Sequence, residues 1–196
     1  GIFDLSYLSS IPNMTVMAPK NKWELSDMMK FAVRYDGPIA LRYPRGEAYD
    51  GLSRFRLPIE YGKWETIYDE NEIALLAVGS MVKTAVEVRD RLRQMGYGCT
   101  LVNARFVKPL DQEAIRTLQT EHQLLVTMEE NVKAGGFGEA VLEYLNEIKS
   151  QTRAMVIALP DDYVEHGNVD LLKQECGIDA ESIIKKIVIE YIGLTK

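Results

Sequence analysis

Short uninterrupted apolar runs alternate with longer amphipathic segments in the second half of the chain. Such runs are typical of strands buried on both faces of a sheet, and the segments between them have apolar residues at helical spacing. We expect strands at 62–68, 73–78, 100–103, 124–128 and 155–159. We expect helices at 79–95, 111–120 and 138–148, and two short helices at the end, the last of them capped by Asp179. This pattern predicts a doubly wound, mostly parallel α/β domain.

The first half of the chain contains a smaller unit of the same kind. Apolar residues at 14–18 and 39–43 predict two strands, and the spacing between them predicts a helix at 22–34 with Asn21 as its N-cap. Strand, helix and strand form a βαβ unit, in which the two strands are expected to be parallel. The unit is too small to bury a core alone, so we expect it to pack on the second block. Residues 47–60 are expected to form a linker that leads into a hairpin, with residues 69–72 as its turn.

Composition narrows the classes of protein. With 46% hydrophobic and 27% charged residues, the chain is typical of a globular protein. Its net charge of -6 argues against nucleic-acid binding, and no run is long enough to span a membrane. Cys99 and Cys176 lie far apart and outside any metal or disulfide pattern, which favours a reduced, cytoplasmic protein. The first residues lack an initiator methionine and the pattern of a signal peptide, so we expect a piece of a longer protein.

The stretch IALRYPRGE delivers two arginines to the end of a predicted strand. Ligands of parallel α/β sheets gather at such ends, and the guanidinium fork of Arg42 or Arg45 suits phosphate or carboxylate. Pro44 restricts the backbone between them, and Gly46 lets the chain pass closely. Two interpretations remain open at this point. The arginines either bind a phosphate or bridge acidic side chains at a domain boundary.

Three other features offer weaker signals. The glycines of Gly135–Gly138 precede a helix and could cradle an anion, but Glu129 and Glu130 beside them favour a tight loop and helix start. The segment 160–167 groups three acids with His166, in a spacing that matches no standard metal site. His122 is expected near a helix end, either as a surface residue or as a partner of the helix dipole. No Ser-His-Asp arrangement is indicated.

Five motifs together resemble one enzyme family over essentially the whole chain. They are GIFDLSYLSSIPNMTVMAP, DGPIALRYPRGE, NARFVKPLD, TMEENVKAGGFG and ALPDDYVEHG. In this order and spacing they are similar to the C-terminal part of the 1-deoxy-D-xylulose-5-phosphate synthases, thiamine-diphosphate-dependent relatives of transketolase. The resemblance implies the end of a pyrimidine-binding domain at 1–46, a linker at 47–60 and a transketolase C-terminal domain at 61–196.

The resemblance also implies a reaction and its residues. The family condenses pyruvate with glyceraldehyde 3-phosphate, losing carbon dioxide, and its product feeds isoprenoid, thiamine and pyridoxal phosphate synthesis. Arg45 would bind the phosphate of the acceptor aldehyde, and Arg42 would orient the loop or pair with a carboxylate. Asp4 and Tyr7 would either support the site or only shape their own segment. The family's catalytic histidine would fall just before Gly1.

The parts that would hold the cofactor fall outside the chain. The ligands of thiamine diphosphate and Mg²⁺ would lie upstream, so no residue here is assigned to either, and the chain alone is expected to be inactive. A homodimer is expected from the family and from the apolar stretches around Phe137 and Leu159. The alternatives are a non-catalytic dimerisation or scaffold fragment, and a split transketolase-type subunit that needs a partner chain.

Overall fold

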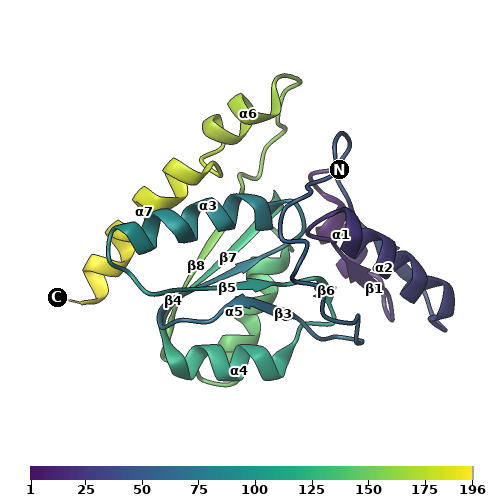
Figure 1. The fold of residues 1–196 in the computed structure, drawn as a ribbon, viewed down its shortest axis with the longest axis horizontal. Coiled ribbons are helices and arrows are strands. Elements are labelled where there is room, and N and C mark those ends of the chain that lie inside the picture. Colours follow the sequence, from purple (N-terminus) through teal and green to yellow (C-terminus); the bar gives the residue numbers. More distant parts are fainter. Residues whose placement is uncertain (196) are drawn as a thin grey trace.

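A five-stranded sheet forms the centre of the molecule in the computed structural model, which describes residues 1–195 (Figure 1). Its strands lie in the order β3 (Glu65–Tyr68), β5 (Cys99–Asn103), β4 (Glu72–Ala77), β7 (His122–Val132) and β8 (Arg153–Leu159). Neighbours among β5, β4, β7 and β8 are parallel, and only the edge strand β3 is antiparallel. The predicted mostly parallel α/β domain is therefore confirmed.

Helices cover both faces of this sheet. In Figure 1, α3 (Met81–Gln94) and α7 (Ala180–Leu194) lie above it and α4 (Gln112–Glu121) lies below. Helix α5 (Phe137–Glu147) shares one apolar core with α4. The short helix α6 (Val169–Glu175) precedes α7. Successive side chains of β4 point to opposite faces, because strand residues alternate. Leu75 belongs to the core beneath α3 and α7, whereas Leu76 belongs to the core that contains α4 and α5.

The first block forms a second, three-stranded sheet. Strand β1 (Thr15–Met17) lies between β2 (Ile39–Leu41), its parallel partner, and β6 (Phe106–Lys108), its antiparallel partner. The predicted βαβ unit is confirmed, and its helix α2 spans Lys22–Arg34 as predicted. Strand β6 was not predicted. It comes from the second block, so this sheet joins the two halves of the chain.

One continuous core also joins the halves. Met17 and Met28 of the first block are completely buried and belong to the same apolar cluster as Phe106 and Phe137 of the second. The first block therefore packs on the second, as its small size predicts.

A buried polar cluster at this junction supplies the specific contacts. Lys20 Nζ lies 3.1 Å from Glu24 Oε1 and 2.6 Å from Glu65 Oε2. Asn103 Nδ2 donates to both carboxylates, at 2.8 Å and 3.2 Å, and all four side chains are buried. Burial opposes ionisation of Glu65, but the hydrogen bonds from Lys20 and the Leu57 amide bring its pKa below the usual value. The cluster links α2 to the central sheet through paired charges.

The cap of α2 shows how this cluster begins. The side chain of Asn21 accepts a hydrogen bond from the Glu24 amide at 2.9 Å, so the predicted N-cap is confirmed. The Glu24 carboxylate does not return to the cap residue, as a capping box would require. It accepts a hydrogen bond from the Lys20 amide at 2.7 Å instead, and its other oxygen pairs with the buried ammonium of Lys20.

The predicted hairpin is wrong. Strand β3 pairs with β5, and β4 lies on the other side of β5. Both edges of β4 are occupied by the parallel strands β5 and β7, so no edge is free for β3. The expected turn is anchored to β5 instead. The Cys99 amide donates to Glu70 Oε2 at 2.9 Å, and Thr100 Oγ1 donates to the Glu70 carbonyl at 2.8 Å.

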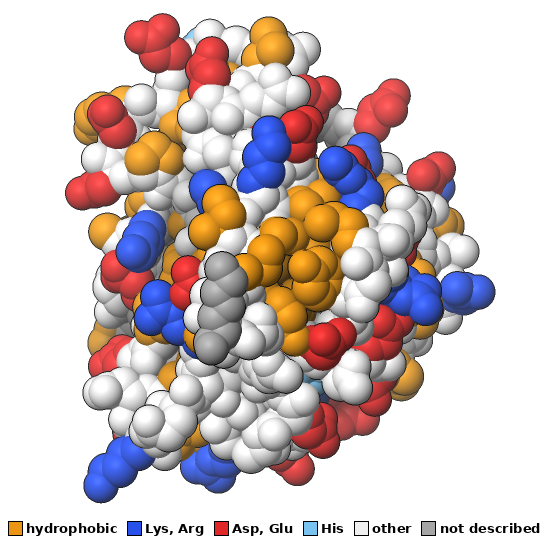
Figure 2. Space-filling view, turned by 90° about the vertical axis from the view of Figure 1, so that its left-hand side faces the viewer, with side chains coloured by type: hydrophobic (Ala, Val, Ile, Leu, Met, Phe, Trp, Pro, Cys, Tyr) orange, Lys and Arg blue, Asp and Glu red, His pale blue; other side chains and the backbone are white. Residues whose placement is uncertain are grey.

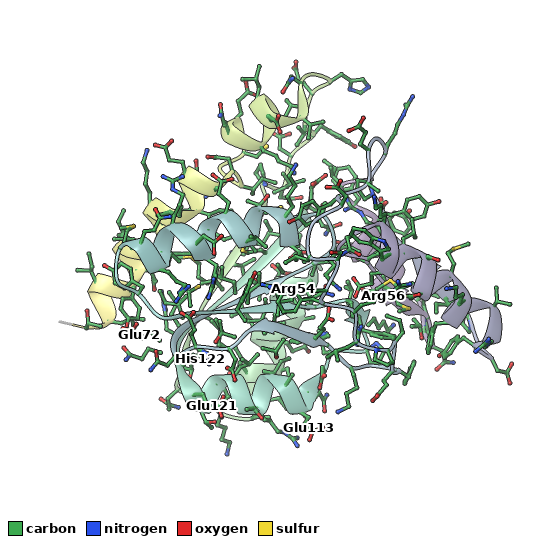
Figure 3. The ribbon with its side chains drawn as sticks, viewed as in Figure 1. Arg54, Arg56, Glu72, Glu113, Glu121 and His122 are labelled. Carbon is green, nitrogen blue, oxygen red and sulfur yellow. The ribbon has the colours of Figure 1, made fainter. Side chains whose placement is uncertain are left out.

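Of the two expectations for His122, the surface position is wrong, whereas its place at the end of a helix is confirmed, because it follows the last residue of α4. His122 begins β7 and is only 5% exposed. Its Nδ1 lies 2.9 Å from the carbonyl oxygen of Leu118, and its Nε2 lies 2.8 Å from Thr100 Oγ1. Both ring nitrogens therefore have hydrogen-bond partners inside the protein, so burial of this polar ring leaves neither nitrogen without a partner. Figure 3 shows His122 beside Glu72 at the end of the sheet where these strands begin.

Candidate functional site

Arg45 lies in the exposed loop that follows β2. The parallel pairing of β1 and β2 places the carboxyl ends of both strands on one side, and the Arg42 amide extends the ladder by donating to the Met17 carbonyl at 2.8 Å. Gly46 turns the chain with φ of +112°, a conformation that favours glycine. Among residues 1–195, no hydrogen bond or ion pair engages the Arg45 guanidinium, so its donors face solvent.

Arg42 has a different environment. Its Nη2 donates to the carbonyl oxygen of Glu130 at 2.9 Å and to that of Gly1 at 3.1 Å. The partners are therefore carbonyl oxygens of two other segments rather than a carboxylate. Arg42 ties the end of β2 both to the start of the chain and to the end of β7.

Asp4 and Tyr7 lie on α1 (Asp4–Ser9), a short helix that was not predicted. They are three residues apart and so share one side of the helix. Asp4 is half-buried in the first turn, and Tyr7 is 57% exposed. The helix escaped prediction because its six residues contain only one buried apolar side chain, Leu5, which leaves no periodic signal.

The glycine loop before α5 is closed to an external anion. Glu129 is completely buried, and its carboxylate accepts hydrogen bonds from the amides of Phe137 at 2.9 Å and Gly138 at 2.8 Å. Burial raises the pKa of Glu129 to about 7, against the two amide donors and the charge of Arg42, which lower it. The helix N-terminus thus already holds a carboxyl group of this chain, in agreement with the tight-loop interpretation.

The segment containing His166 gives no support to a metal site. His166 is exposed, and residues 1–195 contain no group of three or more His, Cys, Asp or Glu side chains that could hold a metal ion. Instead, Tyr163 packs edge-on against Phe3, with ring centroids 5.9 Å apart. Together they border a largely apolar cavity of about 370 Å³ between the start of the chain and α6.

Sequence reasoning missed the polar contacts at the end of β7. The Glu130 carboxylate accepts a hydrogen bond from Ser80 Oγ at 3.0 Å and pairs with Lys173 Nζ at 3.2 Å. Asn131, its neighbour, is completely buried and contacts α1. The only sequence signal was the row of polar residues directly after the apolar run of this strand.

Two protein families match the sequence. Residues 62–183 match "Transketolase, C-terminal domain", and residues 1–50 match "Transketolase, pyrimidine binding domain". The first match covers more than half of the chain. The chain belongs to the transketolase family.

Curated relatives make the resemblance more specific. A 1-deoxy-D-xylulose-5-phosphate synthase of Lachnoclostridium phytofermentans is 54% identical over 188 residues, 95% of this chain and 30% of the relative. The synthase of Clostridium acetobutylicum is 40% identical over 96% of this chain and 30% of the relative. The resemblance to this synthase family that the five motifs predict is therefore confirmed, and the chain spans 30% of the length of these two relatives.

Solved structures share the fold. "Split gene transketolase, inactive beta4 tetramer" superposes with a TM-score of 0.89 at 24% identity, over 100% of this chain and 63% of that one. A transketolase from Campylobacter jejuni gives a TM-score of 0.70 at 16% identity, over 95% of this chain and 28% of that one. At these identities the likeness concerns the fold alone.

Proposed function

We propose that this chain is the C-terminal part of a synthase that condenses pyruvate with glyceraldehyde 3-phosphate, with loss of carbon dioxide, to 1-deoxy-D-xylulose 5-phosphate. The observation that carries the proposal is the 54% identity to such a synthase over 95% of the chain. Residues 1–46 would be the end of its pyrimidine-binding domain, 47–60 a linker and 61–196 its C-terminal domain. The complete protein would work in the cytoplasm as a homodimer.

Arg45 would bind the phosphate of the acceptor aldehyde. Its guanidinium is exposed at a strand end and has no partner within the described chain, so its donors remain available to a dianion. A phosphate held far from the reacting carbon positions the aldehyde for attack and supplies binding energy to the transition state. Asp4 and Tyr7 would support the site from α1.

Thiamine diphosphate and Mg²⁺ would be held by other parts of the complete protein. The described residues offer no acidic cluster for the metal, and the amides before α5 are engaged by Glu129. No residue of this chain is therefore assigned to either group. The cofactor would supply the carbanion chemistry, and this chain would help to bind and orient the acceptor.

None of the described helices has the length and apolar character needed to cross a lipid bilayer.

The test is a product assay on the complete protein. Incubated with pyruvate, glyceraldehyde 3-phosphate, thiamine diphosphate and Mg²⁺, it should release carbon dioxide and form 1-deoxy-D-xylulose 5-phosphate, identified by mass spectrometry. Residues 1–196 alone should form none. Absence of this product from a folded, cofactor-loaded complete protein would refute the proposal.

A second candidate is a split subunit that completes its site with a partner chain. The observation that favours it is the superposition of the whole chain on a structure described as a split gene transketolase, an inactive tetramer of β chains. Expression from the native locus distinguishes the two. A single polypeptide of synthase length supports the first proposal, whereas a short chain that co-purifies with a diphosphate-binding chain supports the second. A short chain without such a partner would instead support a non-catalytic scaffold.

A further inference from the structure

The end of β7 departs from regular pairing at the point where it meets the start of the chain. Met128 pairs with Ile157 and Val132 pairs with Leu159, so four residue steps on β7 face two on β8. Three residues of β7, 129–131, therefore face a single residue of β8, and β7 bulges out of the ladder there. Bulges of this kind redirect side chains and are common beside active sites. Here the bulge turns Asn131 towards α1.

Asn131 caps a helix that has no cap of its own. The first amides of any helix lack intrahelical partners, and α1 begins after Phe3, whose side chain cannot accept a hydrogen bond. The Leu5 amide in the first turn donates instead to Asn131 Oδ1 at 3.1 Å. The residue that performs the capping lies 126 positions away in sequence.

The remaining donors of Asn131 complete the attachment. Its Nδ2 donates to Ser6 Oγ and to the Val132 carbonyl oxygen, both at 2.8 Å. Ser6 Oγ in turn donates to the Ala134 carbonyl oxygen at 2.8 Å. Asn131 is completely buried, so its own hydrogen bonds take the place of bonds to water, which cannot reach its amide.

A helix of six residues is not stable by itself. The position of α1 therefore depends on the burial of Leu5 and on these hydrogen bonds. Two further hydrogen bonds attach the end of β7 to the start of the chain and to the end of β2. The Val132 amide donates to the Ile2 carbonyl oxygen at 2.8 Å, and Arg42 joins the Glu130 carbonyl to the end of β2.

We propose that Asn131 is a positioning residue, through which the C-terminal domain holds α1, and with it Asp4 and Tyr7, in register with the strand end that carries Arg45. The proposal rests on the proposed function, because it assigns a role in acceptor binding to the segments that Asn131 holds. In this proposal the C-terminal domain positions α1 through hydrogen bonds, in addition to packing against the first block.

The test compares two variants of the complete enzyme that alter the same strand. Asn131→Ala removes the cap, whereas the control Val126→Ala removes buried apolar atoms from β7 on the side of α3 and α7. We expect Asn131→Ala to lower kcat/KM for glyceraldehyde 3-phosphate tenfold or more at a temperature where both variants are folded. The control should change it less than twofold. Hydrogen exchange of the α1 amides should accelerate in Asn131→Ala and stay unchanged in the Val126→Ala control.

Ser6→Ala is a milder change that still tests the proposal if Asn131→Ala does not fold. Ser6→Ala removes one contact of Asn131 at a half-buried position, and should lower kcat/KM two- to fivefold with faster exchange in α1. Unchanged kcat/KM and exchange in the Asn131 and Ser6 variants would overturn the proposal, as would an equal loss in the Val126 control. If the wild-type protein makes no product, the proposed function fails, but exchange in α1 still decides whether Asn131 holds the helix.

Discussion

At the scale of single residues, the two arginines of one motif have separate environments. Arg42 is engaged by two carbonyl oxygens, whereas Arg45, three residues later, is exposed and without a partner among residues 1–195. An arginine whose donors are already used holds structure, and one whose donors are free can bind a ligand. Their substitutions should therefore have different consequences.

Arg45→Ala in the complete enzyme should weaken use of glyceraldehyde 3-phosphate. A lost charge-assisted contact costs about 1.5–3 kcal/mol, which is roughly tenfold or more in kcat/KM for the aldehyde. Arg45→Lys should recover part of this, because a point charge replaces the fork. Arg42→Ala should instead lower the melting temperature. Arg54→Ala, another exposed arginine, is the control. Equal losses for pyruvate and aldehyde would show that Arg45 is structural.

Glu129 should make stability depend on pH near neutrality. Burial raises its folded-state pKa to about 7 from an ordinary 4.5, so between these values the folded state holds the proton more tightly than the unfolded state. The free energy of unfolding should then fall as pH rises through this window, by at most about 3 kcal/mol. Glu129→Gln cannot ionise and should lack this slope. Urea titrations of both proteins from pH 4.5 to 8 measure it, and parallel slopes would contradict the assignment.

At the scale of elements, the buried cluster around Lys20 is a polar link between the blocks. Its ammonium lies between two carboxylates, Glu24 on α2 and Glu65 on β3. Ion pairs at the surface contribute little to stability, but removal of one partner from a buried cluster leaves an uncompensated charge. The two classes of pair can be compared within this chain.

Lys20→Met should lower the free energy of unfolding by about 3–5 kcal/mol, because Glu65 loses its only ion-pair partner among the described residues, while Glu24 keeps only the longer pair with Arg105 Nη1 at 3.6 Å. The control is Lys185→Met, which removes an exposed pair with Glu181 on α7 and should change the free energy of unfolding far less, because water screens an exposed pair. Chemical denaturation of the 196-residue chain measures both. Similar values for the two variants would mean that the buried cluster has no special role.

Elements with a strong periodic signal were predictable, and those fixed by distant contacts were not. The bounds of α2 and the caps Asn21, Asp111 and Asp179 follow from local sequence, because each cap accepts a hydrogen bond from the amide three residues further on. Strand β6 and helix α1 are stabilised by partners in the other block, so their own residues show no pattern. The same limit applies to the site. The sequence identified the strand end of Arg45, but the capping role of Asn131 depends on a contact across 126 positions.

At the scale of the whole molecule, the two blocks share a sheet and a core. The apolar stretches that suggested a dimer do not form a surface, because Phe137 and Leu159 are 1% and 4% exposed. Hydrophobic side chains instead gather in a hollow on the face near the C-terminus (Figure 2). Helix α7 has exposed apolar side chains at Ile189, Ile192 and Leu194. The expected homodimer thus remains a proposal based on the family.

The shared core predicts one cooperative unfolding transition for the 196-residue chain. The chain should also show no binding of thiamine diphosphate and Mg²⁺, since none of its residues is assigned to them. Differential scanning calorimetry and titration calorimetry measure these properties. Two separate transitions would show that the blocks are energetically independent, and binding at millimolar affinity or better would mean that cofactor ligands are present here.

The central claim is that the complete protein is a synthase that recognises its acceptor by the phosphate. The most direct measurement is kcat/KM of the complete wild-type protein, with pyruvate as donor, for glyceraldehyde 3-phosphate and for unphosphorylated glyceraldehyde. One charge-assisted phosphate contact predicts a preference of about tenfold or more for the phosphorylated acceptor, with 1-deoxy-D-xylulose 5-phosphate as the product. Equal values for the two aldehydes, or no product from either, would contradict the account.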